Sequence, residues 1–315
     1  MPPQNALPSP RLGPTIPPFD RARADEVIAH VARFAKPRDG RALLEVLTVV
    51  GAWLLCWQLP LWTIPLHCLV SMRLFVVCVH DTGHRNLFSK PWMNKLVGTL
   101  VAPATSFAFN YWAVGHDYHH AHSNDLNYEQ WSQTAPITAR ELRTWPAWRQ
   151  RLFRFFSAPL ALVAAGGPLS IVVLQPLQSD TAVDWAMLAA WWAVLLYTGN
   201  AARFLAVMTL VAMLGLFLFH AQHTFPDAVR YEGLSVKAKG TKDESKNVEG
   251  LYTNAIEGSS LFVVPEVLKW FTARIEYHHI HHLNAKVPFY NLRECHESAR
   301  KGLWKDVKEV TAAQA

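Results

Sequence analysis

The chain has 315 residues, of which 51% are hydrophobic and only 17% charged, against roughly 25% charged in soluble globular domains. Thirteen residues are Trp, a side chain that favours membrane–water interfaces. This composition argues against a soluble protein and predicts an integral membrane protein. The net charge of +6 comes without a basic stripe or a nucleic-acid-binding motif, which excludes nucleic acid as a partner.

The N-terminal part of the chain is polar. Residues 1–20 are rich in Pro and lack the continuous apolar run of a signal peptide, so they are expected to form a disordered cytoplasmic tail. Residues 21–41, RARADEVIAHVARFAKPRDGR, predict a short amphipathic helix.

Four strongly apolar segments follow in two pairs. Residues 43–57 and 61–79 form the first pair, and residues 183–199 and 204–219, joined by a tight turn at Asn200, form the second. A helix that crosses a bilayer needs roughly 20 apolar residues. Each pair therefore predicts a transmembrane hairpin.

The basic residues indicate how these segments lie in the bilayer. All but two of the 30 Lys and Arg fall in three polar blocks: residues 1–41, 85–154 and 224–315. Lys and Arg accumulate on the cytoplasmic side, so the three blocks share that side and the chain crosses the membrane four times. Six spans are the alternative. With four spans, the weaker apolar stretches 94–115 and 157–177 lie at the interface or dip in and return.

Histidine is concentrated in three motifs, HDTGH, HDYHH and HHIHH, all expected on the cytoplasmic side. Residues at i, i+3 and i+4 of a helix share one face, so the histidines of each motif point together. Adjacent histidines differ by about 100° around the helix axis and can serve two neighbouring metals. Neutral imidazole binds Zn, Cu, Fe and Ni. With one histidine beyond the last span, the candidate ligands are His80, His84, His116, His119, His120, His223, His278, His281 and His282.

The motifs resemble the three histidine boxes of the membrane fatty acid desaturases, HxxxH, HxxHH and HxxHH. Residues 268–297, LKWFTARIEYHHIHHLNAKVPFYNLRECHE, are similar to the region around the third box of bacterial acyl-lipid desaturases. AQHTF (221–225) resembles the segment that supplies a further ligand after the last span. The resemblance covers roughly residues 42–310, which we expect to form the desaturase domain between the N-terminal segment 1–41 and a tail, 311–315.

The expected fold is an all-α integral membrane protein with about four transmembrane helices in two hairpins and a cytoplasmic helical cap that carries the dimetal site. The resemblance implies a non-haem diiron centre held by the nine histidines, with O2 as oxidant and an acyl chain, lipid-linked, as the substrate that gains a cis double bond. The resemblance also favours a bacterial inner membrane, with the active site on the cytoplasmic side.

Each turnover requires two electrons from outside the chain. No side chain removes hydrogen from a methylene group, so a cofactor must do so. The sequence contains no haem-binding domain, no Rossmann glycine fingerprint and no CxxC among its four cysteines. We therefore expect a ferredoxin or a b-type cytochrome as electron donor, and the basic cytoplasmic face suits an acidic carrier.

Several residues near the motifs have open roles. Asp81, Asp117 and Glu276 either accept hydrogen bonds from metal-bound histidines or are solvated surface charges. Arg73 lies inside the second span, where it must snorkel to a headgroup or pair with a carboxylate. Residues 107–112, FAFNYW, either line a substrate tunnel or anchor the chain at the interface. The remaining histidines are weaker ligand candidates (His122, His220 and His279) or incidental (His30, His67 and His296).

Two other functions compete with desaturation. A hydroxylase or ketolase acting on lipid, carotenoid or alkane has similar boxes, although the ending HHIHHLNAKVPFYNL favours a desaturase. A metal transporter is expected to place its polar ligands near the middle of the bilayer, whereas these histidines lie at the ends of the predicted spans.

Overall fold

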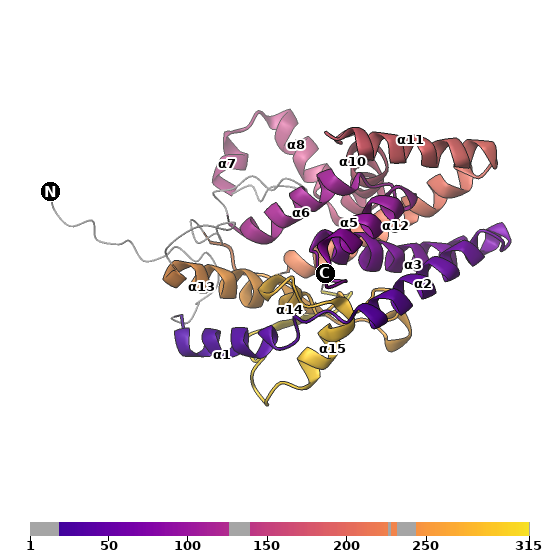
Figure 1. The fold of residues 1–315 in the computed structure, drawn as a ribbon. Helices are drawn as coiled ribbons and strands as arrows, with labels where there is room; N and C mark the ends of the chain where they lie inside the picture. Colours follow the sequence, from indigo (N-terminus) through magenta and orange to yellow (C-terminus); the bar gives the residue numbers. More distant parts are fainter. Residues whose placement is uncertain (1–18, 126–138, 226–227, 232–243, 315) are drawn as a thin grey trace.

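The computed structural model describes residues 19–125, 139–225, 228–231 and 244–314. The predicted disordered tail, residues 1–20, lies almost entirely outside them. Helices dominate the described part of the chain, and Figure 1 shows two long hairpins extending to one side. The α-helices are α1 (Arg21–Ala32), α2 (Asp39–Cys56), α3 (Ile64–Phe75), α4 (Asp81–Gly83), α5 (Pro91–Val101), α6 (Phe109–His122), α7 (Ala139–Thr144), α8 (Ala147–Phe156), α9 (Pro159–Ala161), α10 (Gln175–Leu177), α11 (Ala182–Tyr197), α12 (Ala201–His223), α13 (Glu244–Tyr252), α14 (His278–Leu283) and α15 (Phe289–Glu297).

The prediction of one helix over residues 21–41 is wrong. The helix α1 ends at Ala32, and α2 begins at Asp39, earlier than the apolar segment that starts at residue 43. Pro37 lies between the two helices, and proline disfavours the helical conformation for the residue before it. At the other end of α1, the Asp20 side chain accepts a hydrogen bond from the Arg23 backbone N–H (3.0 Å) and caps the helix.

The first hairpin consists of α2 and a helix longer than α3 alone. A π-helical turn, Val76–His80, and α4 continue α3, so that Leu61–Gly83 forms one helical run of 23 residues. Such π-helical turns occur frequently at functional sites. This helical run ends inside HDTGH, and it therefore carries the first motif from the apolar hairpin into the cap.

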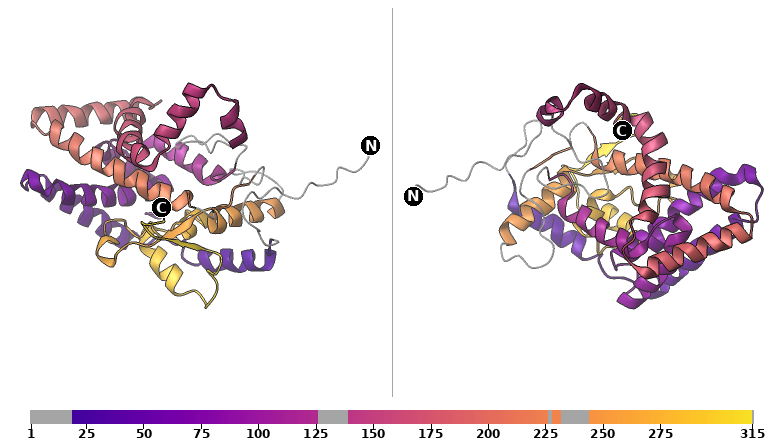
Figure 2. Two further views of the ribbon diagram at one scale, coloured as in Figure 1. Left: turned by 180° about the vertical axis from the view of Figure 1, so that it is seen from behind. Right: turned by 90° about the horizontal axis from the view of Figure 1, so that it is seen from above.

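The second hairpin, α11 and α12, packs against the first through α12 and α3 (Figure 1 and Figure 2). Gly199, with φ +70°, makes the tight turn that the sequence predicts beside Asn200. Arg203 then joins the hairpins, because its guanidinium donates to the carbonyl oxygens of Cys56 (2.6 Å) and Leu59 (2.9 Å). These bonds satisfy carbonyls at and beyond the end of α2 that have no helical partner.

Two helices, Leu61–Gly83 and Ala201–His223, are long and apolar enough to cross a membrane. α11 is apolar but has only 16 residues, and the 18-residue α2 carries Asp39, Arg41 and Glu45. The count of four spans therefore stays a prediction.

Residues 157–177 form a broken helical segment that packs on α12. It comprises α9, two π-helical turns (Leu162–Gly166 and Leu169–Leu174) and α10. A Cβ on Gly167 would stand 2.7 Å from the carbonyl oxygen of Ala212. Glycine therefore allows this segment to approach α12 closely.

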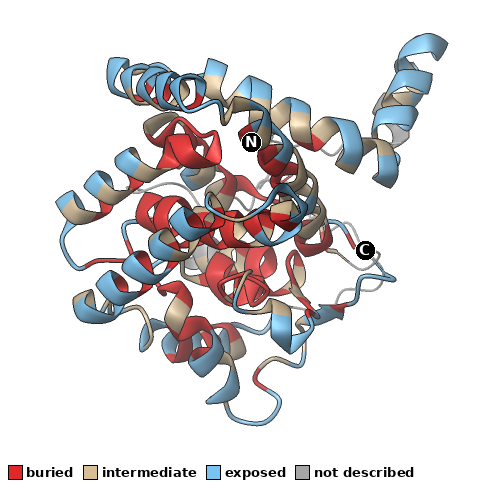
Figure 3. Cartoon of the chain, turned by 90° about the vertical axis from the view of Figure 1, so that its right-hand side faces the viewer, coloured by how far each residue is buried: buried red, intermediate tan, exposed pale blue. Residues whose placement is uncertain are grey.

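The fold is mostly helical, as predicted, but the C-terminal cap also contains a short pair of strands that the sequence did not predict. Strand β1 (Ser260–Phe262) pairs in parallel with β2 (Lys308–Val310) in the register Ser260↔Lys308. The main hydrophobic core joins this cap to α1 and α2, with Val27, Val46 and Ile280 among its buried residues. Figure 3 shows the buried residues gathered in the middle of the molecule, while the outer helices are exposed along much of their length.

Candidate metal centre

The structure brings all nine predicted histidines together. They come from the end of the first hairpin, α6, the end of α12 and α14, and they form two groups. Within each group, the candidate ligand atoms lie within 4.8 Å of one another. The first group contains His80, His84, His116, His120 and His281, and the second contains His119, His223, His278 and His282.

Adjacent histidines are divided between the groups, as the 100° step of a helix predicts. His119 belongs to the second group and His120 to the first, and His282 and His281 divide in the same way. The groups themselves touch, because the rings of His120 and His282 stack with centroids 4.2 Å apart. The arrangement is compatible with two adjacent metal ions.

Close packing around the first two motifs explains their local sequence. A Cβ on Gly83, in HDTGH, would stand 2.8 Å from the Trp112 ring. That ring in turn stacks on His116, with centroids 4.6 Å apart. The glycine thus lets α6 pack against the end of the first hairpin, which brings His80 and His116 together (centroids 4.9 Å apart).

The ring nitrogens of these histidines are better suited to binding a metal ion than to forming hydrogen bonds with one another. His84 Nε2, His116 Nε2 and both ring nitrogens of His120 and His282 are buried without a hydrogen-bond partner among the described residues, and each such atom costs about 1–3 kcal/mol if left unsatisfied. His80 Nε2 lies 3.0 Å from His281 Nε2, and His278 Nε2 lies 2.8 Å from His223 Nε2. Two nitrogen atoms that each lie about 2.1 Å from the same metal ion are separated by a similar distance.

Burial keeps the histidines of the cap in the neutral form that binds metals. Burial lowers the pKa of His84 to about 4, although its hydrogen bond with Asp117 opposes the shift, and burial together with neighbouring histidines lowers the pKa of His119 to about 3. The pKa values of His281 and His282 fall well below the ordinary value for the same reasons. At neutral pH each of these rings therefore offers a lone pair.

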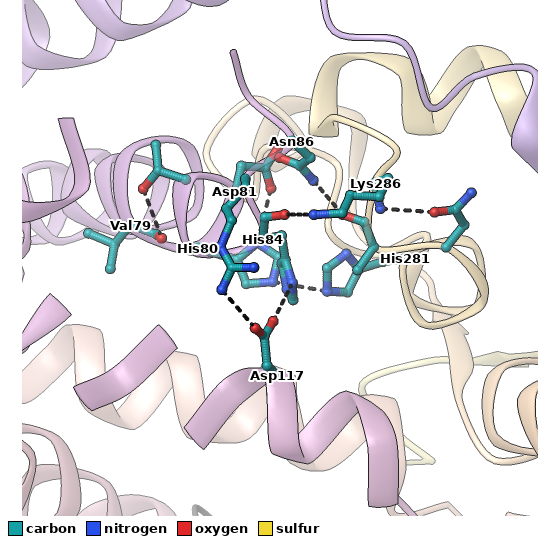
Figure 4. A network of polar contacts seen from close by, with 12 residues as sticks. Val79, His80, Asp81, His84, Asn86, Asp117, His281 and Lys286 are labelled. Carbon is teal, nitrogen blue, oxygen red and sulfur yellow. Dashed lines mark hydrogen bonds and ion pairs between the residues drawn. The ribbon is translucent and has the colours of Figure 1, made fainter. Parts of the chain in front are cut away.

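Two of the three predicted carboxylates contact the first group (Figure 4). Asp81 Oδ1 accepts a hydrogen bond from His80 Nδ1 (3.0 Å), and its Oδ2 accepts one from the backbone N–H of Phe289 (2.8 Å). Asp117 lies 3.6 Å from His84 Nδ1. Glu276 instead accepts a hydrogen bond from the Thr272 hydroxyl (2.7 Å).

Buried amides and a lysine, absent from the sequence-based candidates, fix the backbone around the histidines. Asn254 Nδ2 donates to the carbonyl oxygen of His120 (2.9 Å), and Asn86 Nδ2 to that of Ala285 (2.7 Å). Lys286 Nζ donates to the carbonyl oxygen of His84 (Figure 4). These bonds join segments about 130 or 200 positions apart in the chain, so no local sequence pattern reveals them.

Arg73 pairs with a carboxylate, one of the two outcomes that its position allowed. It is 3% exposed, and its guanidinium binds Glu45 of α2 and the carbonyl oxygen of Trp270. The Trp270 ring lies 4.3 Å from Arg73 Cζ. The interaction ties the first hairpin to the cap.

The remaining histidines lie outside both groups. His279, although fully buried between ligand candidates, places Nε2 3.2 Å from His296 Nδ1. His30 Nε2 lies 2.8 Å from the carbonyl oxygen of Cys295. His67 packs against the Trp57 ring. His122 and His220 are likewise absent from the groups.

A largely apolar cavity of about 180 Å³ adjoins the histidines. Residues of both groups contribute to its wall, His80 and His116 from the first and His278 from the second. Phe107 and Trp112 of the FAFNYW segment also line it, which favours the tunnel interpretation of that segment. The rest of the wall comes from the first hairpin, α12, the broken helical segment and Ile275, and includes Met72, Phe75, Ile171, Val211, Gly215 and Phe219.

Comparison with known proteins identifies the class. Residues 51–309 match the fatty acid desaturase family, so the chain belongs to that family. It is 25% identical to a fatty acid desaturase of Bacillus subtilis (strain 168) over 87% of this chain and 83% of the relative. It is 27% identical to an sn-1 oleoyl-lipid 12-desaturase of Anabaena variabilis over 84% of this chain and 77% of that protein. The chain is therefore a fatty acid desaturase, an oxidoreductase, and the competing transporter and hydroxylase interpretations are not retained.

Proposed function

We propose that the nine histidines bind two iron ions and that this diiron centre introduces a cis double bond into a lipid-linked acyl chain. The observation that carries the proposal is the division of the histidines into two touching groups, whose buried ring nitrogens at His84, His116, His120 and His282 include several without a hydrogen-bond partner among the described residues. Imidazole is a suitable ligand for iron. The lipid-linked substrate is supported by relatives named as oleoyl-lipid desaturases.

The two irons, when bound, supply the O2 chemistry that removes two hydrogens from adjacent carbons of the acyl chain. The protein positions the chain and excludes water. Phe75, Phe107 and Trp112 contact one another along the cavity, with ring centroids between 4.6 and 6.0 Å apart. This aromatic wall suits a methylene chain, since burying apolar surface is favourable. Asp81 holds His80 in the tautomer that leaves Nε2 free for the metal.

The proposal includes the orientation of the protein. Residues 42–310 form the desaturase domain, with four spans of a bacterial inner membrane and the histidines on the cytoplasmic side. A ferredoxin or a b-type cytochrome delivers two electrons per turnover to that face. The apolar length of Leu61–Gly83 and Ala201–His223 supports this placement.

The test is expression in a host that lacks polyunsaturated fatty acids, followed by fatty acid profiling with localisation of the double bond. We expect a product two hydrogens lighter than its precursor and about two irons per chain. A product that gains an oxygen atom would identify a hydroxylase.

A matched pair of variants on α12 tests the ligands. His223→Ala removes a member of the second group, whereas His220→Ala, one turn away, removes a histidine outside both groups. We expect His223→Ala to lose iron and product and His220→Ala to keep both. Wild-type iron content in His223→Ala would overturn the ligand assignment.

A further inference from the structure

Helix α8 carries an apolar face that the described part of the chain leaves uncovered. Its Trp148, Leu152, Phe155 and Phe156 side chains are 62%, 49%, 63% and 51% exposed, and no residue of the helix is buried. These residues stand at i, i+4, i+7 and i+8, the spacing of a single helical face. Leu160, just beyond the helix, is 82% exposed and extends the apolar surface.

The other side of α8 is basic. Arg154 lies opposite the apolar residues, and Arg149 and Arg151 lie along the two edges of the apolar face, as the step of about 100° per residue requires. Arg149 also places its Cζ 3.9 Å from the Trp145 ring centroid. No Asp or Glu occurs between residues 145 and 177. Arginine keeps its charge under all physiological conditions, so this side presents positive charge with no acidic residue near it in the sequence.

The helix adjoins the wall of the apolar cavity. It packs against α9 and the π-helical turn Leu162–Gly166, which packs against α12. The residues that follow, Gly167, Ser170 and Ile171, line the cavity. Figure 1 shows α8 at the edge of the molecule, running across the direction of α11.

We propose that α8 lies in the membrane–water interface, with its apolar face among the acyl chains and its arginines on anionic lipid headgroups. An exposed helix with Trp, Phe and Leu on one face and arginines on the other is typical of this arrangement. A symmetric contact with a second copy fits less well, because it would bring two sets of arginines together. The inference rests on the membrane placement proposed above, and it gives the cavity wall a fixed depth in the bilayer.

Spin labels at two adjacent positions test the depth of α8. Nitroxides are attached to Phe155→Cys and to Arg154→Cys in the full chain, held in nanodiscs of phosphatidylcholine and phosphatidylglycerol. The unsubstituted chain, whose four cysteines are buried, controls for background labelling. We expect power saturation by O2 to dominate at 155 and saturation by a water-soluble nickel chelate to dominate at 154. Equal access of the chelate to both labels, or protection of the 155 label from both reagents, would overturn the proposal.

The headgroup contact is tested by the lipid that co-purifies with the protein. We expect phosphatidylglycerol to be enriched over phosphatidylcholine, and the enrichment to fall about a hundredfold when Arg149, Arg151 and Arg154 are all replaced by Gln, since each basic residue near an anionic surface contributes a factor of about five. The matched triple Lys variant keeps the charge and is expected to keep the enrichment. Unchanged enrichment in the Gln variant would contradict the proposal. Both measurements need no metal and no turnover, so their failure is distinct from failure of the proposed desaturation.

Discussion

The two histidine groups share the second and third motifs, but HDTGH contributes only to the first group and His223 only to the second, and the protein holds the groups differently. Carboxylates orient the first group, since Asp81 contacts His80 and Asp117 lies beside His84. In the second group, His223 instead has neutral contacts, with Ser123 Oγ 3.4 Å from its Nδ1 and a backbone hydrogen bond at Gly258. A carboxylate that accepts the outer N–H makes an imidazole a stronger ligand, and a distant neutral hydroxyl does so far less.

The two candidate metal positions are therefore not equivalent in their surroundings. The first group offers five histidines with carboxylate support, and the second offers four. On the proposed function, the first position is expected to retain its metal more tightly.

The largest effect is expected from removing one histidine of each group. His120 and His282 are a matched pair, because their rings stack on each other from opposite groups. Both Ala variants are expected to lose activity by more than the 10–100-fold typical of an outer hydrogen-bond partner. His282→Ala leaves three histidines in the second group and is expected to retain about one metal per chain. His120→Ala leaves four histidines in the first group and is expected to retain more metal. Elemental analysis of purified protein measures this, and equal losses would remove the distinction between the groups.

The outer contacts are expected to have the next largest effect. Asp81→Asn preserves shape and removes charge beside His80, and we expect metal affinity or activity to fall 10–100-fold. Ser123→Ala removes a long neutral contact of His223 and is expected to lower affinity only about twofold, the low end for a hydrogen bond. Competition with a chelator measures both. Similar losses in the two variants would show that the carboxylate has no special role.

The sequence predicts which histidines lie together in the structure, but not how they divide into two groups. The nine histidines could be chosen from the sequence because helix geometry determines which side chains share a face, and that geometry depends only on residues close together in the chain. The assignment of His223 and His278 to one group depends on where α12 ends relative to α14. That position depends on packing between distant segments, including the hydrogen bond that Gln222 Nε2 of α12 donates to the carbonyl oxygen of Ile275, 53 residues away (2.9 Å).

The correct parts of the predicted fold depend on local signals, and the missed parts depend on contacts between distant segments. The turn at Gly199 and Asn200 was predictable, because a Gly-Asn pair between two apolar runs is a local signal in the sequence. In the structure, Gly199 has the positive φ that glycine adopts readily. The strands β1 and β2 were missed, because each has three residues and becomes stable only when the other is adjacent. The pairing of Arg73 with Glu45 likewise required the packing of α2 on α3.

A smaller effect, confined to the first group, is expected for Asn254→Ala. The substitution leaves the buried end of α6 without a donor for the His120 carbonyl, which costs about 1–3 kcal/mol. We expect a lower thermal midpoint together with weaker binding at the first position alone. Thr48→Ala is the control, because it removes a side-chain hydrogen bond on an exposed part of α2. Equal destabilisation by the two substitutions would exclude a specific role for Asn254.

Gly215→Leu is expected to change neither metal position and to alter the cavity that both groups share. A Cβ at Gly215 meets no atom within 4 Å, and the residue lines the cavity between Val211 and Phe219. Glycine inside a helix lowers its stability by about 1 kcal/mol relative to Ala. The space that Gly215 leaves open in the cavity gives a reason for its presence despite this cost. A leucine would fill part of the volume available to the acyl chain, and we expect turnover to shift toward shorter chains while the metal content stays constant. Gly51→Leu is the matched control, because its Cβ also meets nothing within 4 Å but it lies on the exposed side of α2. An unchanged fatty acid profile in Gly215→Leu would show that the acyl chain does not occupy this cavity, because a side chain placed there could not otherwise leave substrate selection untouched.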